Sequence, residues 1–362
     1  MPVPADRIAR LRLIRSENIG PVTYFQLLAR FGSAQAAIDA IPDLAARGGG
    51  RVPKLASRAE AEREIEAVER LGARHLFLGQ GLYPPLLAEL ETAPPALTVK
   101  GDLGLLDRMS VALVGARNAS AAACRYARQL AQGLGGAQLV VVSGLARGID
   151  SAAHDGALET GTIAVIAGGI DIVYPPENEA RQRAIAERGV LVAEQPPGVE
   201  PRARHFPYRN RIIAGLTHGT VVVEAAPKSG SLITARYATE FGREVMAVPG
   251  SPLDPRAQGC NQLIRDGATL IQSAEDVLEA LSPLSRRPFR QRELDYAPPG
   301  PSAEVNETAR RAVTDLLGPT PVPVDELIRQ SGLAPAGVQT VLLELELAGR
   351  LERHAGGKVS LA

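Results

Sequence analysis

Residues 139–158 read LVVVSGLARGIDSAAHDGAL, a short apolar run that ends at a glycine turn and is followed by a helical stretch. This order, strand, turn and helix, decides the fold because it recurs through the middle of the chain. The other apolar runs are VALVG (111–115), TIAVIAGG (162–169), VLVAE (190–194), GTVVVEA (219–225) and EVMAVPG (244–250). Fully apolar strands separated by helices are covered on both faces, which predicts a parallel sheet in a doubly wound, Rossmann-type α/β fold. Ligands of such folds bind beyond the carboxyl ends of the strands, so the turns there form the candidate site.

Length and composition predict a multidomain protein without a membrane span. The chain has 362 residues and a formal net charge of zero, so a polyanion would have to bind a local basic patch. No apolar run reaches the roughly 18 residues that span a bilayer, and charged residues interrupt the N-terminal apolar stretches, which predicts a cytoplasmic protein. The two cysteines, Cys124 and Cys260, are far apart in the sequence, which argues against a disulfide framework and against a zinc site. We expect no metal and no cofactor.

Smaller domains are expected on both sides of the sheet domain, which we assign to residues 79–282. Residues 1–78 predict a helical domain, in which Asn18-Ile19-Gly20-Pro21 separates two helices. This pattern is typical of a helix-hairpin-helix or SAM-like unit that either packs only or contacts DNA. The paired prolines of residues 83–97 predict a strap, a segment without regular structure that packs across the sheet domain. Residues 283–303 are polar and rich in proline, which predicts an exposed linker.

The last segment, 304–362, predicts three helices (306–317, one from Val324, and 336–348) and a β-hairpin (350–359), the outline of a winged helix. Glu344 and Glu346 lie on its third helix, where a helix that faces phosphates should not carry acids. A protein-contact or structural role is therefore favoured for this module.

The strand-end turns carry residues that suit phosphate. Glycines permit tight turns and close backbone approach, helix N-termini offer unpaired amides, and arginine adds a bidentate donor. The candidates on the first three turns are Gly115, Arg117, Ser143, Gly144, Arg147, Gly148, Gly168 and Gly169. The turn after residue 225 resembles an anion nest but lacks P-loop spacing, so nucleotide hydrolysis is not expected; its candidates are Lys228, Ser229, Gly230, Ser231 and Thr234.

A basic segment with interleaved aromatics precedes the fifth strand. Cations can follow a nucleic-acid backbone while rings stack on bases, which favours a single strand as the ligand. The candidates are Arg202, Arg204, His205, Phe206, Arg209 and Asn210. In the alternative interpretation, Arg209 and Arg211 pair with carboxylates of the sheet. His154 and Asp155 are expected to serve local hydrogen bonding, because no matched nucleophile accompanies them; no catalytic residue is predicted.

Taken together, these motifs resemble the DNA-processing protein A family, called DprA or Smf. The resemblance covers residues 80–280 through YPPLL, PPALTVKG, VGARNAS, SGLARGIDSAAHDGAL, AGGIDIVYPPEN, HFPYRNRIIAGL, VVVEAAPKSGSLITA and VPGSPLDPRAQGCNQLIRDGA. It implies an extended Rossmann fold that binds single-stranded DNA in a basic pocket and forms a homodimer. It also implies a mediator that protects incoming strands and loads RecA recombinase during natural transformation. Arg117 would bind the strand, as would Arg204 or Arg202, and Phe206 would stack on a base.

The sequence leaves two alternatives to a DNA-binding mediator, an enzyme and a scaffold. A nucleotide phosphoribohydrolase-like enzyme of the Rossmann group carries P-G-G-x-G-T-x-x-E after a strand. Here the turn is PKSGSLITA, and the acidic Glu224 precedes it rather than follows it, so that catalytic arrangement is missing. A scaffold whose terminal modules carry the partners would show no salt-sensitive DNA binding.

Overall fold

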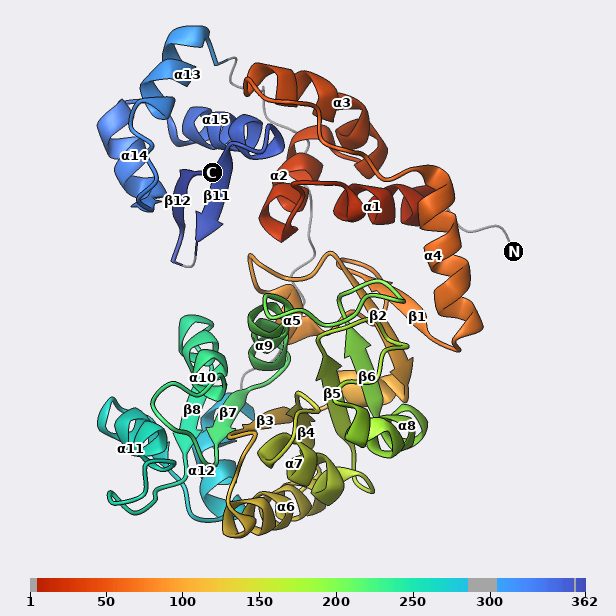
Figure 1. Ribbon diagram of the computed structural model, residues 1–362, viewed down its shortest axis with the longest axis vertical. Coiled ribbons are helices and arrows are strands. Elements are labelled where there is room, and N and C mark those ends of the chain that lie inside the picture. Colours follow the sequence, from red (N-terminus) through yellow and green to blue (C-terminus); the bar gives the residue numbers. More distant parts are fainter. Residues whose placement is uncertain (1–4, 286–304, 355) are drawn as a thin grey trace. The chain divides into compact units, whose positions relative to one another are not determined.

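The computed structural model describes residues 5–285 and 305–362 apart from residue 355. The chain divides into two compact units (Figure 1). The sheet unit is Glu64–Glu293, and the helical unit combines Met1–Arg63 with Leu294–Ala362. Helix α12 runs to Ser285, beyond the predicted start of the linker, and the remaining residues of that linker, 286–303, lie outside the described residues.

The sheet unit is built on nine strands in the order β1-β2-β6-β5-β4-β3-β7-β8-β9. The pairs from β6 to β9 are all parallel, as the apolar runs predict. The strands are β1 (Arg74–Phe77), β2 (Ala96–Gly101), β3 (Ser110–Val114), β4 (Val140–Ser143), β5 (Thr162–Ile166), β6 (Val190–Ala193), β7 (Gly219–Val222), β8 (Glu244–Ala247) and β9 (Thr269–Leu270).

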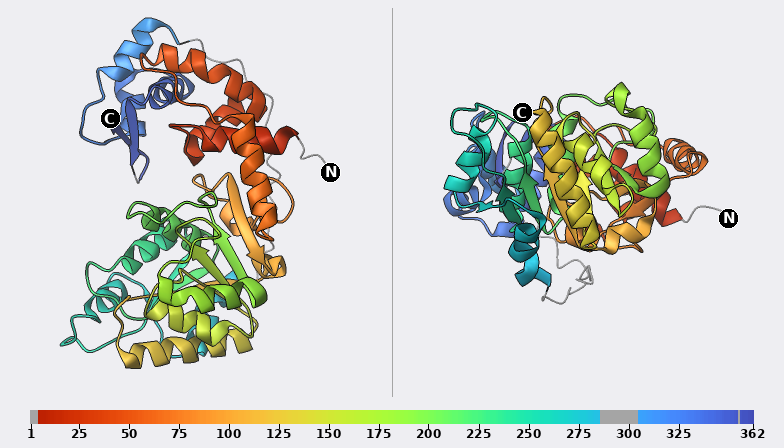
Figure 2. Two further views of the ribbon diagram at one scale, coloured as in Figure 1. Left: turned by 45° about the vertical axis from the view of Figure 1, so that its right-hand side comes forward. Right: turned by 90° about the horizontal axis from the view of Figure 1, so that it is seen from below.

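Helices cover both faces of this sheet, which confirms the doubly wound α/β fold; α6 and α7 lie on one face and α9 and α10 on the other (Figures 1 and 2). The α-helices of the unit are α5 (Pro85–Ala88), α6 (Ala121–Gly136), α7 (Ile149–Ala157), α8 (Glu179–Arg188), α9 (His205–Gly215), α10 (Ser231–Glu240), α11 (Gln258–Arg265) and α12 (Ala274–Ser285). Two short 3-10 helices, η1 (Leu103–Asp107) and η2 (Pro176–Asn178), complete it.

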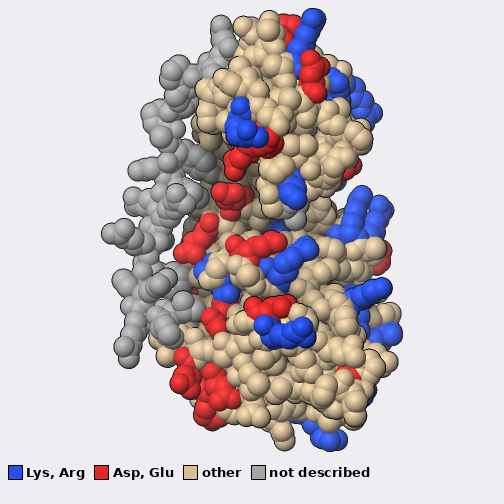
Figure 3. Space-filling view, turned by 90° about the vertical axis from the view of Figure 1, so that its left-hand side faces the viewer, with Lys and Arg blue, Asp and Glu red and all other residues tan. Residues whose placement is uncertain are grey.

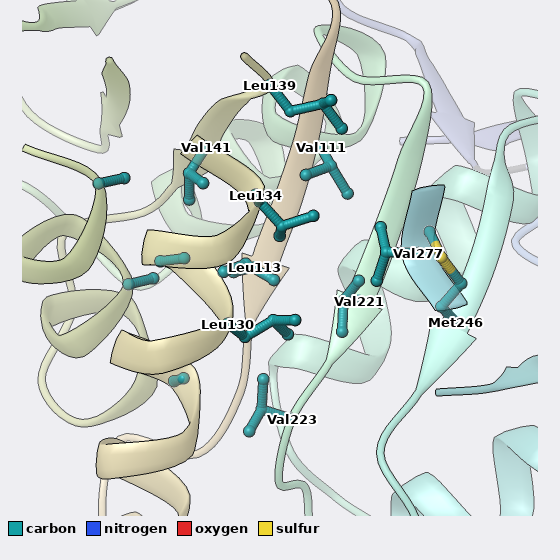
Figure 4. Close-up of a cluster of buried hydrophobic side chains, with 14 of the residues drawn as sticks. Val111, Leu113, Leu130, Leu134, Leu139, Val141, Val221, Val223, Met246 and Val277 are labelled. Atoms are coloured by element: carbon teal, nitrogen blue, oxygen red, sulfur yellow. The ribbon is translucent and has the colours of Figure 1, made fainter. Parts of the chain in front are cut away.

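A core of the unit lies between the sheet and α6, α7 and α12 (Figure 4). Leu113 and Val221 project from neighbouring strands toward Leu130 and Leu134 of α6, and all four side chains are almost fully buried. Burial of such aliphatic side chains contributes roughly 1.5–3 kcal/mol each, which holds the parallel strands in register. The strand ends, and the turns that follow them, are thereby fixed in place.

The proline-rich strap is the part of the sheet unit that differs from expectation. Pro84 and Pro85 begin the one-turn helix α5, because a fixed φ suits the first position of a helix. The strand β2 starts at Ala96, directly after Pro95, and pairs antiparallel with both β1 and β6. The prediction of a strap without regular structure was therefore wrong. Because β1 at residues 74–77 joins this sheet, the helical domain ends before residue 78, where we had placed its boundary.

The helical unit combines an N-terminal helical domain with a three-helix, three-stranded winged-helix domain. The predicted turn after the first helix is present: α2 begins with Pro21 and ends at Gly32, whose φ of 73° closes the last turn. The elements are α1 (Ala5–Arg15), α2 (Pro21–Phe31), α3 (Ala34–Arg47), α4 (Arg58–Arg70), α13 (Glu307–Thr314), β10 (Val322–Pro323), α14 (Val324–Ser331), α15 (Pro335–Leu347), β11 (Leu351–His354) and β12 (Lys358–Leu361). Helix α4 crosses the boundary at residue 63.

Candidate nucleic-acid interface

A pocket of about 360 Å³ opens where the carboxyl ends of β3, β4 and β5 meet α9. Four segments of the chain supply its walls, so the fold brings together turns that are far apart in the sequence. The lining residues are Arg117, Asn118, Gly144, Leu145, Ala146, Arg147, Ile166, Ala167, Gly168, Ile172, Tyr174, Pro175, Pro176, Phe206 and Arg209. Six of them, Arg117, Gly144, Arg147, Gly168, Phe206 and Arg209, are among the predicted site residues.

The mouth of the pocket holds one exposed arginine against an aromatic pair. The guanidinium carbon of Arg117 lies 4.9 Å from the centroid of the Phe206 ring, within the range of a cation–π contact. The ring of Tyr174 is tilted by 55° against Phe206, with centroids 5.6 Å apart, and Tyr174 is 45% exposed. No described carboxylate forms an ion pair with Arg117. An exposed cation next to aromatic rings is a combination that can contact both the phosphate and the base of a nucleotide.

The turn that carries Arg117 is fixed by Glu224, which lies two residues after the end of the neighbouring strand β7. The backbone N–H of Ala116 donates to the Glu224 carbonyl at 2.7 Å. The Glu224 carboxylate accepts from both the backbone N–H (3.0 Å) and the hydroxyl (2.7 Å) of Ser120, whose Oγ in turn caps α6 by accepting from Ala123. Glu224 is only 8% exposed, so its carboxylate holds the loop in place and is not available to a ligand. This role of Glu224 was not predicted from the sequence.

Gly115 and Gly148 serve close packing between two of these turns. A Cβ at Gly115 would lie 2.5 Å from Ile149, and one at Gly148 would lie 2.3 Å from the Ala116 carbonyl. Gly148 also has a φ of 72°, a conformation that side-chain-bearing residues rarely adopt. These glycines therefore set the spacing of the pocket walls and do not line the pocket themselves.

The floor of the pocket contains a buried arginine. Arg209 is 6% exposed, and its Nη1 donates to the Val165 carbonyl at 3.1 Å. Burial lowers the pKa of Arg209 to about 10, while the nearby Asp150 carboxylate acts in the opposite direction. Asp150 accepts from the Ala146 N–H at 3.3 Å, and burial raises its pKa. A Cβ at Gly144 would meet the Arg209 guanidinium at 1.4 Å, so only glycine leaves it room.

Arg147 stands at the rim but is already paired. Its Nε forms an ion pair with Glu177, and both side chains are substantially exposed. The hydrogen bond to Arg147 lowers the pKa of Glu177, and the same bond raises the pKa of Arg147. A phosphate would have to compete with this carboxylate for the guanidinium.

Two predicted contacts need correction because their side chains are buried. The Ser143 hydroxyl is fully buried and donates to the Leu113 carbonyl at 2.6 Å, inside the sheet. Thr234 is 1% exposed within α10. Neither hydroxyl can reach a ligand in this conformation. A polar residue at a strand end does not have to contact a ligand, because the buried backbone groups there also need hydrogen-bonding partners.

The other predicted residues lie outside the pocket lining. Gly169 packs under the loop that follows β6, since its N–H donates to the Val199 carbonyl at 2.9 Å. Asn210 donates to the Gly230 carbonyl at 3.2 Å. Ser229 and Ser231 share a hydrogen bond of 2.7 Å between their hydroxyls, and the neighbouring Lys228 is exposed. The turn at 226–231 is thus a separate feature of the same sheet edge.

The basic segment before α9 divides into exposed and buried members. Arg202 and Arg204 are exposed and form no ion pair with a described residue. His205 is 6% exposed and accepts a hydrogen bond from the Arg202 N–H, and burial lowers its pKa. Arg211 is held by the Glu194 carboxylate and the Thr92 carbonyl, as the alternative interpretation of that residue predicts. The cations free to meet a strand here are Arg202 and Arg204.

No group of three or more His, Cys, Asp or Glu in the described part of the chain could hold a metal ion. His154 is buried, bonded through Nδ1 to the Thr162 hydroxyl at 2.7 Å, and burial lowers its pKa to about 3.

In residues 5–285 and 305–362, apart from 355, no helix is long and apolar enough to cross a bilayer.

Comparison with known proteins places the three parts of the chain in one family. The family model described as "DNA recombination-mediator protein A" matches residues 74–282. A "DprA-like N-terminal HHH domain" matches residues 4–67 and a "DprA winged helix domain" residues 297–357.

Individual proteins that resemble this chain carry the names of the same family. DNA processing protein DprA of Streptococcus pneumoniae is 48% identical over 198 residues, 54% of this chain and 70% of that protein. Protein Smf of Escherichia coli is 39% identical over 289 residues, 77% of this chain and 75% of the relative. Among solved structures, DprA of S. pneumoniae aligns with a TM-score of 0.62 at 35% identity, over 80% of this chain and all of the other. DNA processing protein A of Helicobacter pylori, whose structure was solved to study its single-stranded DNA binding mode, aligns with a TM-score of 0.53 at 28% identity, over 58% and 96% of the two chains. The protein described here therefore belongs to the DNA recombination-mediator protein A family, which includes the DprA and Smf proteins.

Proposed function

We propose that this protein is a non-enzymatic recombination mediator that binds single-stranded DNA at the pocket of the sheet unit. The observation that carries the proposal is the exposed Arg117 guanidinium over the Phe206 ring at the mouth of that pocket. A cation and an aromatic face side by side match the two parts of a nucleotide, the phosphate and the base. The relative from H. pylori, studied for its binding of single-stranded DNA, supports this assignment.

Single strands suit this site better than duplex. In a duplex the bases are stacked and paired, so a ring at the mouth of a pocket has no free base face to contact. The Arg117 and Phe206 pair is also one small cluster, whereas a double helix presents phosphates along an extended surface. The site should therefore prefer an unpaired strand, with affinity that falls as salt rises.

The wider proposal places this binding in the cytoplasm, during natural transformation. The protein would act as a homodimer, protect incoming strands and load RecA recombinase onto them. This proposal is supported by the membership of the family and by the pocket of the sheet unit, which holds the candidate site for a DNA single strand. RecA loading is measurable as the shortening, by this protein, of the lag before RecA filaments assemble on a strand coated with single-strand-binding protein. An unchanged lag, with strand binding intact, would remove the loading step from the proposal.

The binding test is fluorescence anisotropy of the full chain with a labelled single-stranded oligonucleotide and its duplex, across a salt series. Arg117→Ala should weaken strand binding and reduce the salt slope by about 0.7, the value for one phosphate contact on a single strand. Arg183→Ala is the matched control, because Arg183 is an exposed arginine of α8 that does not line the pocket. Absence of binding to either DNA by the unaltered chain would refute the proposal, and an assay for nucleotide cleavage would follow.

A further inference from the structure

Helix α15 occupies the position from which a winged-helix domain would read DNA. Helices α14 and α15 form a helix-turn-helix, joined by a turn at Gly332 with φ 66°. In DNA-reading members of this motif, the second helix enters the major groove. Here that helix reads PAGVQTVLLELEL and contains no Lys or Arg, the residues that supply most contacts to phosphates and to guanine.

The two acids of α15 are held within the winged-helix domain. The Glu344 side chain is 1% exposed and accepts from Arg310 at 2.8 and 3.2 Å. Glu346 accepts from Arg353 of the hairpin at 2.8 Å. Both acids of α15 are therefore neutralised by arginines of the same domain, Arg310 and Arg353.

Helix α15 buries two stripes, and each belongs to a different core. Val338, Val341, Leu342 and Leu345 complete the core of the winged-helix domain. Leu343 and Leu347, one turn apart, join the core of the N-terminal helical domain instead. The second stripe is the outward one, which a DNA-reading helix would leave free for the groove.

Polar side chains beside this outward stripe also contact the N-terminal domain. Gln26 of α2 donates to the Gln339 side-chain carbonyl at 2.9 Å, and Asn18 of the α1–α2 hairpin donates to the Leu347 carbonyl at 3.4 Å. Arg30 donates to the Thr340 hydroxyl at 3.4 Å. Gln and Thr are residue types that could meet base edges, and here they are engaged by protein.

Two glycines after α3 allow the backbones to touch. A Cβ at Gly48 would lie 2.1 Å from the Glu344 carbonyl oxygen, and a Cβ at Gly50 would lie 2.2 Å from that of Ala348. Arg350 strengthens the contact by donating to the Gly48 carbonyl at 3.0 Å. Such an approach leaves no room for a groove of DNA between α15 and α3.

We propose that the winged-helix domain does not read DNA but binds the N-terminal helical domain of the same chain through α15. We call this contact between α15 and the N-terminal domain the clasp. Helix α15 binds α2, α3 and the α1–α2 hairpin through the outward stripe, so its partner is a helical protein surface of the same chain. Duplex DNA could reach α15 only by displacing that surface. This proposal does not depend on DNA binding at the pocket of the sheet unit.

The experiment is hydrogen exchange of the full chain with Gly48→Ala, which disturbs the clasp and alters neither core. Gly48 has a φ of −71°, which alanine adopts freely, so the strain arises only against α15. Exchange in α2 and α3 should accelerate by at least about tenfold, as expected when overpacking shifts an opening equilibrium. Gly20→Ala is the matched control, because Gly20 has a φ of −93° and no atom within 4 Å of the added Cβ. Unchanged exchange in Gly48→Ala would overturn the clasp.

A duplex challenge separates the clasp from a DNA reader. With excess 20-base-pair duplex, exchange in α15, α2 and α3 of the unaltered chain should remain as it is without DNA. Protection of α15 together with faster exchange in α2 and α3 would show that duplex displaces the N-terminal domain, and would overturn the proposal. If Gly48→Ala unfolds the N-terminal domain altogether, Gln339→Ala removes only the bond to Gln26; it should accelerate exchange in α2 by a smaller factor, and no change there would also count against the clasp.

Discussion

Replacing Phe206 and Arg117 singly and together separates stacking from charge at the pocket mouth. Phe206→Ala removes one aromatic face, and a base stack contributes roughly 1–3 kcal/mol, so strand affinity should fall about 5- to 150-fold. No charge is lost, so the salt slope should stay as it is. Arg117→Ala should instead reduce the slope by about 0.7. The two side chains touch at 4.9 Å, and an exposed cation–π contact contributes about 0.5–1 kcal/mol. The double variant should therefore lose less than the sum of the single losses, by about that amount.

Anisotropy with a labelled single strand at five or more salt concentrations measures both quantities for each variant. Phe206→Leu is the matched control, because it keeps an apolar side chain and removes only the ring; it should behave like Phe206→Ala if stacking is the cause. A reduced salt slope in Phe206→Ala would refute this reasoning, because the ring would then act by placing Arg117. Full affinity in Phe206→Ala would remove stacking from the site.

Three further results are expected from the described contacts. Glu177→Gln should tighten strand binding up to about threefold and steepen the salt slope in anisotropy, because it releases Arg147 from its ion pair; unchanged binding would mean that Arg147 does not face the strand. His154 has a folded-state pKa of about 3, below the ordinary 6.5, so stability should be complete above pH 6.5 and fall as the pH drops toward 3, while the unfolded chain takes up the proton. In urea unfolding, the unaltered chain should lose about 1.4 kcal/mol more per pH unit in that window than His154→Gln, and parallel pH profiles would contradict the assignment. Ser120→Ala should lower stability by about 1–2 kcal/mol in the same assay, because it removes both the cap of α6 and a bond to Glu224, and Ser120→Thr should restore most of it; equal losses in both variants would point away from the hydroxyl.

The parallel core of the fold was predictable because its strands are apolar on both faces. Each of the six apolar runs coincides, to within one residue, with one of the strands β3 to β8, and the helices between them follow from the same pattern. The strands β1 and β2, at one end of the sheet, were not predicted. Their signal is short, and Pro94 and Pro95 stand directly before β2, where proline costs no ladder hydrogen bond. Proline next to a strand and proline within one look alike in a single sequence.

The candidate site was predictable in its position more than in its contacts. Strand-end turns meet at one sheet edge in any doubly wound fold, which is why Arg117, Gly168 and Phe206 come together. Which polar group points inward is decided by packing: Ser143 satisfies a backbone carbonyl, and Glu224 holds the Arg117 turn. Tyr174 and Phe206 form a ring pair across more than thirty residues of sequence, a contact that no local spacing reveals.

The balance of charges at this edge sets how strongly salt should affect binding. The chain is neutral overall, and acidic and basic side chains are interspersed on the face shown in Figure 3. Near the pocket, Arg147 and Arg211 already have carboxylate partners. The cations of these loops that pair with no described carboxylate are Arg117, Arg202, Arg204 and Lys228. If all four meet phosphates, the affinity for a single strand should fall with a log–log salt slope of about 3, since each contact contributes about 0.7. A much steeper slope would require cations beyond these loops, such as those of a second copy of the chain, and a slope near 0.7 would leave Arg117 as the main contact.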